Sequence, residues 1–395
     1  MSAASWPSGR RSRAAVVARF GESRTALVER ALRTADPLAD AVVEEIHGGG
    51  PAVRVQLDLG IRHGLASLTD PPPAVAALLT ATETLPPGID PAIVDAGPAP
   101  IFTVPTVVRI LSLSAGALLR TYESPSIAVL LDTTGRLVDG AERRLQDTGR
   151  WLLTATLPGT LHPGAPGYVA TLQVRMLHAH MRRLARVRGY DELTHGAPIN
   201  QVDLARTWMD FTLVSLRAQE TLGYDLTEQE TAQVYRYWQV LAHLLGVDPD
   251  LVGGITGNAE AARVDALLQA VTGPLAGHAR ALAGALVDAL AVRLGELLRL
   301  PRPIGRQLIR SLGRRFHGDA VADALDLRRS LLLDLVVDVV AVGLRADRRL
   351  RRRDAERWER ARIANVEAAR ELLDAPEEET LYEVHRAEHP DRVAG

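Results

Sequence analysis

Apolar residues recur at helical spacing through most of the chain, in long segments rich in alanine and leucine. Clusters of proline and glycine separate these segments. No sustained alternation of apolar and polar positions marks a strand, and only the short apolar runs 52–59 and 127–131 are strand candidates. The pattern therefore predicts an all-α, multi-helix fold.

Three helices in the middle of the chain carry clear start and stop signals. Side-chain oxygens cap helix N-termini, an acidic first turn suits the helix dipole, and glycine ends a helix. Further helical pattern covers 261–298, 304–316 and the residues from 319 onward. The first helix is 168–186, which follows the breaker Pro166-Gly167. The second starts at the cap Asn200, has Asp203 in its first turn and stops at Gly223. The third starts at the capping box of Thr227 and Glu230 and stops at Gly246.

The two ends of the chain differ in composition from the middle. Residues 1–20 are basic, and the apolar run behind the Arg10-Arg11 pair is too short for a secretion signal. Residues 345–362 are dense in arginine with acidic residues interspersed, which is typical of a solvated helix with internal ion pairs; a helix that docks on a membrane surface or a partner is the alternative. We predict a disordered basic tail at 1–20, a helical domain at 21–345, and a charged helix and tail at 346–395.

Composition and charge exclude several classes of protein. Aromatic residues make up only 4% of the chain, so Ala, Leu and Val must build the core, which favours helix-on-helix packing. The formal net charge of −2 argues against a nucleic-acid-binding surface. The absence of cysteine excludes thiolate-ligated haem, c-type haem attachment and Cys-ligated iron–sulfur clusters. The longest apolar stretch, 331–344, is short for a membrane span and contains two aspartates, so we expect no transmembrane helix and a cytoplasmic protein.

Catalytic motifs are scarce, and the histidines remain as candidates for chemistry. No G-x-S-x-G elbow, P-loop or H-E-x-x-H motif occurs. His178 and His180 share one predicted helix, where residues two apart point about 200° away from each other, so this pair is a poor shared metal site. His178 lies beside an apolar stripe. A histidine there is more often a core or boundary residue, but a neutral imidazole on a rigid helix also suits a haem ligand.

Four sequence blocks, and a weaker fifth, carry a resemblance to a known family. They stand in the family's order and extend over about two thirds of the chain. The blocks are YESPSIAVLLDTTGRL (122–137), VRMLHAHMRR (174–183), GAPINQVDLARTW (196–208), YWQVLAHLLGVDPDLV (237–252) and RRFHGDAVADALDL (314–327). On these residues the chain resembles the MpaB / latex-clearing-protein oxygenase family.

This resemblance implies a b-type cytochrome with a helical, globin-like core and extra helices. The family's proximal haem ligand is the histidine that opens an H-A-x-x-R motif, which falls on His178, Ala179 and Arg182. We therefore expect haem b, with its iron on His178. Arg175 or Arg182, one helical turn away, is expected to bind a haem propionate.

The rubber-cleaving members also carry a distal R-x-x-K-T motif, whose threonine lies thirty residues before the ligand. At the matching positions this chain has Arg144, Asp147 and Thr148, so an aspartate replaces the distal lysine. The resemblance implies that Arg144 and Thr148 line the distal side of the haem and that Asp147 acts there as an acid or base. The replacement argues against rubber cleavage.

The function implied is that of a haem b-dependent oxygenase or peroxygenase, which uses dioxygen or peroxide on an apolar, isoprenoid-like small molecule. Two alternatives remain open. The same fold and His178 would also serve a non-catalytic protein that stores, senses or carries haem or a diatomic gas. A helical interaction protein without a cofactor is supported only by the charged C-terminal helix. No nucleic-acid partner is expected, and peripheral membrane contact stays open.

Overall fold

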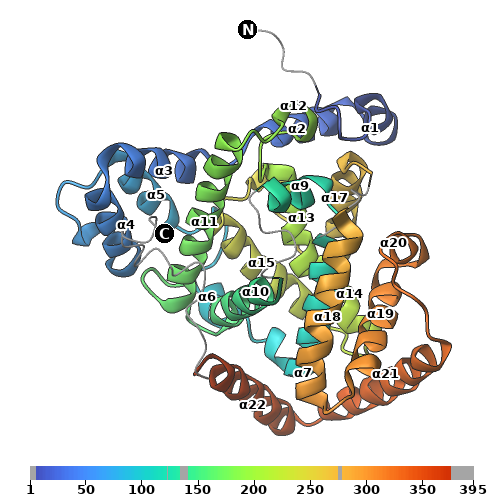
Figure 1. Cartoon of the computed structure of the whole chain (residues 1–395). Coiled ribbons are helices and arrows are strands. Elements are labelled where there is room, and N and C mark those ends of the chain that lie inside the picture. The colour runs from blue at the N-terminus through green and yellow to red at the C-terminus, as the bar shows by residue number, and fades with distance from the viewer. Residues whose placement is uncertain (1–5, 122, 134–140, 275–277, 375–395) are drawn as a thin grey trace, which may run out of the picture.

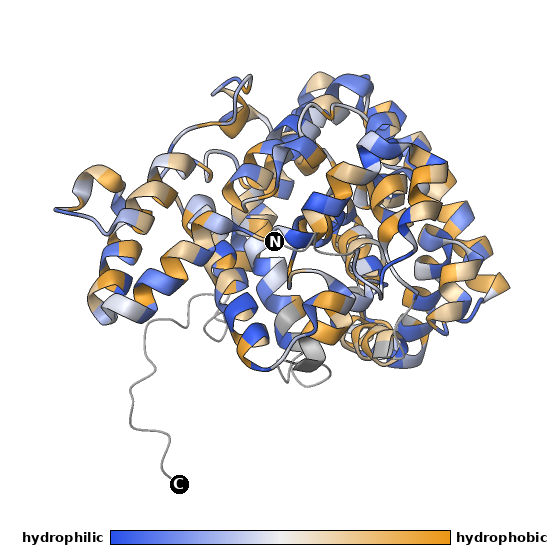
Figure 2. Cartoon of the chain, turned by 90° about the horizontal axis from the view of Figure 1, so that it is seen from above, coloured by the Kyte–Doolittle hydropathy of each residue, from blue (hydrophilic) through white to orange (hydrophobic). Residues whose placement is uncertain are grey.

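The computed structural model describes residues 6–121, 123–133, 141–274 and 278–374. Within these residues every regular element is a helix, as Figure 1 shows. The predicted all-α fold is confirmed. Figure 2 shows hydrophilic and hydrophobic residues interspersed along most helices, as expected for helices that each bury one face.

Both strand candidates are wrong. The run 52–59 belongs to α4 (Pro51–His63), and the run 127–131 belongs to α9 (Pro125–Thr133). In α4 the buried residues Val53, Leu57 and Ile61 lie four positions apart, which is a helical period, and a proline starts each helix.

The first part of the chain forms short helices at the top and the left of Figure 1. Helix α3 packs on α5 and on the central helix α11, so these helices form one wall of the core. The elements are α1 (Arg13–Phe20), α2 (Glu22–Arg33), α3 (Pro37–Gly49), α4, the 3₁₀ turn η1 (Leu65–Ser67), α5 (Pro73–Thr82), α6 (Ile93–Ala96) and the 3₁₀ turn η2 (Ile101–Thr103).

The middle of the chain supplies the central helices. Two of its segments, η3 and η4, are π-helical turns inside longer helical runs, a feature that often marks functional sites. The elements are α7 (Thr106–Leu111), η3 (Ser112–Leu118), α8 (Leu119–Thr121), α9, α10 (Ala141–Thr156), α11 (Pro166–Val187), α12 (Glu192–His195), α13 (Gln201–Met209), η4 (Asp210–Val214), α14 (Ser215–Thr221), α15 (Glu228–Leu244) and α16 (Pro249–Val252).

The last part of the chain packs against the middle, with α21 and α22 along the lower edge in Figure 1. Helices α18 and α19 form a closely packed pair. The elements are α17 (Asn258–Val271), α18 (His278–Leu298), α19 (Arg302–His317), α20 (Asp319–Ala324), α21 (Leu331–Arg351) and α22 (Ala355–Asp374).

The capping signals of the three middle helices are confirmed. Helix α11 starts at Pro166, and Asn200 accepts the N–H groups of Val202 and Asp203 at the start of α13. Thr227 and Glu230 form the reciprocal capping box of α15. The predicted helix 261–298 is instead two helices, α17 and α18.

Two main apolar clusters form the core. The larger joins α2–α5, α10, α11, α13, α15 and α17, and the smaller joins α7, η3, α18, α19 and the α20 region. A third, minor cluster packs Val366 and Ala369 of α22 on Phe102 and Leu157. The C-terminal helix is therefore part of the packed molecule.

The ends of the described chain differ from the predicted tails. Residues 13–20 form α1, and Arg10 is buried in an ion pair with Asp203, which holds this segment on the core. The expected boundary at 345/346 falls inside α21, because its helical pattern continues to Arg351. Residues 375–395 lie outside the described residues.

Within the described part, no single helix is long and apolar enough to cross a membrane, although the bent pair Ile93–Thr103 and Thr106–Thr121 meets that criterion together.

Candidate functional site

The α10–α11 hairpin carries all the residues predicted for the site. A short connection joins the two helices, so they run antiparallel, and Trp151 Nε1 donates a hydrogen bond to Thr171 Oγ1 at 3.1 Å. His178 lies seven residues after Thr171, and position 144 lies seven residues before Trp151. Seven residues make about two helical turns. Positions 144 and 178 therefore lie at the same height along the hairpin axis, about 10 Å from the Trp151–Thr171 contact, on the sides of the helices that face each other.

His178 has the environment of a neutral imidazole. The residue is partly accessible as a whole, but its Nδ1 atom is shielded and has no hydrogen-bond partner within the described residues. Burial, with a smaller contribution from the nearby Arg182 guanidinium, lowers the pKa of His178 to about 4. An uncharged ring with an unpartnered nitrogen fits a metal-ligating histidine.

The two arginines that flank His178 are both buried but differ in their free donors. Arg175 forms hydrogen bonds from Nε and Nη2 to Asp36, at 2.7 and 2.9 Å, and from Nη1 to the carbonyls of His243 and Leu244. Arg182 Nε donates to Asp40 at 2.6 Å, whereas its buried Nη2 has no hydrogen bond and lies 4.0 Å from Asp36. Arg182 alone therefore keeps a donor for an additional carboxylate.

An apolar cavity of about 450 Å³ lies beside α10. Thr148 is part of its wall, Asp147 is partly buried and is not a lining residue, and the side chain of Arg144 lies outside the described residues. His178, Arg175 and Arg182 do not line it either. The walls come from many segments, including both π-helical turns and α22, and are represented by Ile110, Leu118, Phe211, Trp238, Leu290 and Leu373.

Several other histidines have structural contacts. His180 lies near His47, with ring centroids 6.3 Å apart, on a different side of α11 from His178. His243 Nε2 lies 2.8 Å from the Ala81 carbonyl, and His162 Nε2 lies 2.9 Å from Asp95. His195 is the last residue of α12. The contacts of His162 and His243 are structural ones within the fold.

A buried ionic cluster lies at the junction of α8, α13, η4, α17 and α19, and the sequence analysis missed it. Arg120 Nη1 lies 3.2 Å from Asp210 Oδ1 and also pairs with Asp265. Arg206 Nη2 lies 3.4 Å from Glu123 Oε2. Charged residues at 206 and 210 inside an otherwise apolar helical segment were the available signal, since such residues are rarely buried unless paired.

This cluster has more acidic than basic groups. If Glu123, Asp210 and Asp265 were all ionised, they would exceed the two guanidiniums by one negative charge. Burial raises the pKa of Glu123 to about 7 and that of Asp210 to about 6. His317 Nδ1 lies 3.8 Å from Glu123 Oε1, and His317 Nε2 lies 2.9 Å from the Ala115 carbonyl. The cluster is therefore able to hold a proton near neutral pH.

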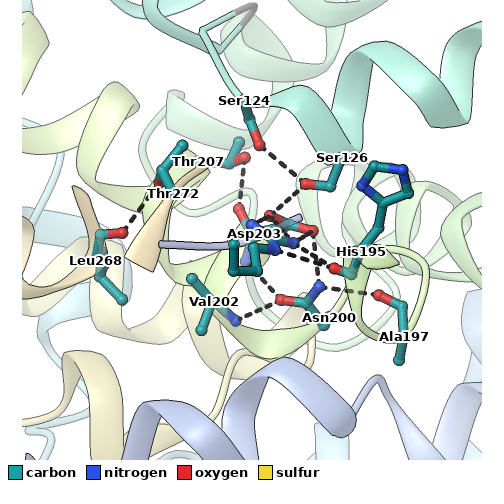
Figure 3. A network of polar contacts seen from close by, with 11 residues as sticks. Ser124, Ser126, His195, Ala197, Asn200, Val202, Asp203, Thr207, Leu268 and Thr272 are labelled. Carbon is teal, nitrogen blue, oxygen red and sulfur yellow. Dashed lines mark hydrogen bonds and ion pairs between the residues drawn. The ribbon is translucent and has the colours of Figure 1, made fainter. Parts of the chain in front are cut away.

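Asp203 organises a second buried network, shown in Figure 3. Ser126 Oγ donates to Asp203 Oδ1 at 2.8 Å, and Asn200 Nδ2 donates to Asp203 Oδ2 at 2.9 Å. Arg10 pairs with the same carboxylate at 3.3 Å and donates to the His195 carbonyl. This network joins the N-terminal segment to the starts of α9 and α13, which is more than the helix-capping role that the sequence predicted.

Comparison with known proteins places most of the chain in a class of oxygenase catalytic domains. Residues 107–346, more than half of the chain, match the family described as ER-bound oxygenase mpaB/B'/Rubber oxygenase, catalytic domain. The chain belongs to this family, which confirms the resemblance seen in the sequence.

Two relatives show how far the similarity extends. A rubber oxygenase of Streptomyces sp. (strain K30) is 26% identical over 172 residues, which cover 43% of this chain and 40% of the relative. The matched region thus spans less than half of that relative's length. The structure of latex clearing protein LCP in the closed state superposes with a TM-score of 0.63 at 21% identity, covering 85% of this chain and 90% of that one, and so shows a shared fold.

Proposed function

We propose that this protein is a haem b-dependent oxygenase that acts on an apolar, isoprenoid-like small molecule. The observation that carries the proposal is the neutral His178, whose buried Nδ1 has no partner among the described residues, on a helix hairpin that borders an apolar cavity. Membership of the oxygenase family supports the same reaction class. When bound, the haem iron would supply the dioxygen or peroxide chemistry.

The residues of the hairpin have distinct proposed roles. His178 binds the iron, since its pKa of about 4 keeps the ring neutral at physiological pH. Arg182 Nη2 donates to a haem propionate, whereas Arg175 holds α11 against Asp36 at the start of α3. Arg144, Asp147 and Thr148 act on the distal side, where Asp147 accepts or donates a proton.

The cavity suits an apolar substrate. Its wall is mainly aliphatic and aromatic, and its volume of about 450 Å³ lies within the usual range of roughly 300–1,000 Å³ for small-molecule sites. Thr148 links the cavity to the proposed distal side, because it lies on α10 next to Asp147 and lines the cavity wall. The substrate would be held by burial, with water excluded from it.

The test is the haem content of the purified full chain, expressed with a haem precursor and measured as the pyridine haemochromogen. We expect one non-covalent haem b per chain in the wild type. His178→Ala should lose haem, and His180→Ala should keep it, because the two side chains point about 200° apart on α11.

The control His180→Ala lies on the same helix, so a general loss of helix stability would affect both variants alike. A wild-type protein without a Soret band would overturn the proposal. Turnover of a terpenoid with dioxygen or peroxide separates an oxygenase from a protein that only stores or senses haem.

A further inference from the structure

Arg109 is a buried cation of the cavity wall that has no counter-ion among the described residues. Arg109 of α7 lines the cavity and is only 5% exposed. Within the described residues its only hydrogen bond runs from Nη2 to Thr106 Oγ1 at 3.1 Å, and its Nε is buried without a partner. Phe102 offers a cation–π contact at 4.5 Å, which offsets part of the cost of burial.

Such a guanidinium normally has a carboxylate beside it. Buried charges in proteins are usually paired, because leaving water without a partner is costly. The pKa of Arg109 is lowered to about 10 by burial alone, so the group still carries its charge at neutral pH. The described lining residues of the cavity include no Asp or Glu. Among the described residues nothing supplies this partner, which leaves the place beside the guanidinium for a ligand.

We propose that Arg109 is a carboxylate receptor inside the apolar cavity, so that the cavity takes a molecule with an acidic group on an apolar body. This inference deepens the proposed function, since it adds an anionic group to the substrate. The planar guanidinium can bind a carboxylate through two parallel N–H groups. Two ligands share this chemistry: an acidic long-chain substrate and a propionate of haem.

The test measures binding of palmitate and of methyl palmitate to the full chain by titration calorimetry. We expect the wild type to prefer the acid by roughly tenfold or more, as for a buried charge-assisted pair. Arg109→Gln should remove this preference and leave the ester unaffected, and Arg109→Lys should retain part of it. Arg24→Gln, at an exposed arginine of α2, is the matched control.

The haem content of Arg109→Gln distinguishes the two ligands. Unchanged haem with a lost acid preference assigns the carboxylate to the substrate. Reduced haem with no acid preference in the wild type assigns it to a propionate. Equal acid and ester binding in the wild type, together with unchanged haem in Arg109→Gln, would overturn the inference. A wild type without haem that still prefers the acid would overturn only the proposed function.

A second inference concerns α21, whose apolar residues lie mostly on its outward face, with Val337 and Ala341 buried on the other face. Its outward face is aliphatic over roughly half of the helix circumference. Six of these side chains are between 47% and 72% exposed: Leu331, Leu332, Leu335, Val336, Val339 and Val340. This stripe is unusual, because exposed apolar residues on a soluble surface normally occur singly.

The inner face of α21 is held by polar contacts. Asp334 accepts a hydrogen bond from Ser311 Oγ at 2.6 Å, and Asp338 pairs with Arg315, both from α19. Arg348 is buried and donates to the carbonyls of Asp225 and Thr103. These contacts fix the rotation of α21, so the aliphatic stripe stays outward.

The segment around this stripe is strongly basic. Residues 328–353 contain eight arginines and three aspartates, a formal charge of +5 in a chain of −2. Arg349 and Arg353 are exposed and make no ion pair within the described residues. Arg349 continues the outward face at the end of the stripe, seven residues after the exposed Val342.

We infer that α21 docks on the surface of an anionic lipid bilayer. A basic, amphipathic helix lies in the bilayer interface with its apolar face buried and its cations among the headgroups. A second copy of this chain fits less well, since the exposed Arg349 and Arg353 of two facing copies would repel each other. The helix would lie on the membrane and not span it, because no single described helix passes the criterion for a span.

The test is flotation of the full chain with vesicles of phosphatidylcholine alone or with one-third phosphatidylglycerol. The wild type should float with the anionic vesicles and weakly with the neutral ones. Leu335→Gln/Val339→Gln should reduce flotation at least several-fold without lowering the melting temperature, since both side chains face solvent. Arg349→Gln/Arg353→Gln should also weaken it, by about fivefold per arginine.

Two matched controls distinguish binding through the stripe from nonspecific binding by exposed apolar or basic residues. Val187→Gln/Leu193→Gln alters equally exposed apolar residues near α11 and α12, and Arg24→Gln/Arg54→Gln alters exposed arginines elsewhere. Both controls should float like the wild type. Equal flotation of the wild type and the stripe variant would overturn the inference. A wild type that forms a dimer and does not bind vesicles, with a stripe variant that is monomeric, would also overturn the inference.

Discussion

Asp147 carries the prediction about the substrate of this chain. It stands where the resemblance places a lysine, and an ionised carboxylate repels anionic oxygen species and cannot donate a hydrogen bond. We predict weak or no cleavage of polyisoprene by the wild type, measured as aldehyde and ketone products. Gain of cleavage in Asp147→Lys would support the prediction strongly. Vigorous cleavage by the wild type would contradict it.

The sequence identified His178 but could not reveal its surroundings. The H-A-x-x-R motif located the residue, and the helical period separated it from His180. The difference between Arg175 and Arg182 arises from Asp36 and Asp40, which lie about 140 positions away in the chain. No sequence motif marks Arg109 either. Its distinguishing feature is that no described carboxylate lies beside it in the folded structure.

At the Asp203 network we predict a large loss of stability from a single substitution. Asp203→Ala leaves the buried Arg10 guanidinium without its partner, which should lower the free energy of unfolding by about 3–5 kcal/mol. Urea denaturation at neutral pH measures the change. The matched control is Asp191→Ala, the exposed N-cap of α12, which should cost only about 1 kcal/mol. Equal effects of both variants would contradict the role given to the network.

At the scale of the elements, the sequence predicted what depends on local signals. The caps of α13 and α15 were predictable because Asn200 and Thr227 bond to residues two or three positions away. The π-helical turns η3 and η4 were not, since nothing in their local pattern distinguishes them from α-helix. The strand candidates failed because short apolar runs do not by themselves separate strands from buried helices.

Helix α22 lies outside the matched family region and reaches the cavity through Leu372 and Leu373, as η2 does through Ile101. Its buried anchor is Val366, which packs on Phe102 and Leu157. We predict that Val366→Asp detaches α22, because a buried carboxylate there would lack a partner. Limited proteolysis at the bend 352–354 should be roughly tenfold faster or more.

The matched control for α22 is Ala364→Asp, which adds the same charge at an exposed position of the helix. It should leave the proteolysis rate close to that of the wild type. An apolar dye that binds in the cavity should respond to Val366→Asp and not to Ala364→Asp. If both variants were cleaved at the same rate, α22 would not be held by its apolar anchor.

For the whole molecule, the division into tail, domain and charged helix was the least predictable feature. Arg10 and Val366 belong to segments whose composition looks like solvated ends, yet each is buried against the core. Their partners, Asp203 and Phe102, lie far away along the chain. Long-range pairs of this kind decide the packing of chain ends, and composition does not report them.

The buried ionic cluster makes a pH-dependent contribution to the stability of the whole molecule. Burial raises the pKa of Glu123 from 4.5 to about 7, so the folded chain binds this proton more tightly than the unfolded chain does. The contribution of Glu123 is therefore fully present below pH 4.5 and is lost as the pH rises through about 7. His317 acts in the opposite direction, since its pKa is lowered to about 4 and its unfolded form takes up a proton below pH 6.5.

Because these effects oppose each other, the informative quantity is the difference between Glu123→Gln and the wild type. Gln keeps the shape of a protonated Glu and does not titrate, so the variant should gain stability relative to the wild type as the pH rises from 4.5 to 7. The gain is at most about 1.4 kcal/mol for each unit of pKa shift, or a few kcal/mol in total. Urea midpoints of both proteins at pH 4.5, 5.5, 6.5 and 7.5 measure it. A difference that is constant with pH would mean that Glu123 is ionised throughout and that Arg206 compensates its burial in full.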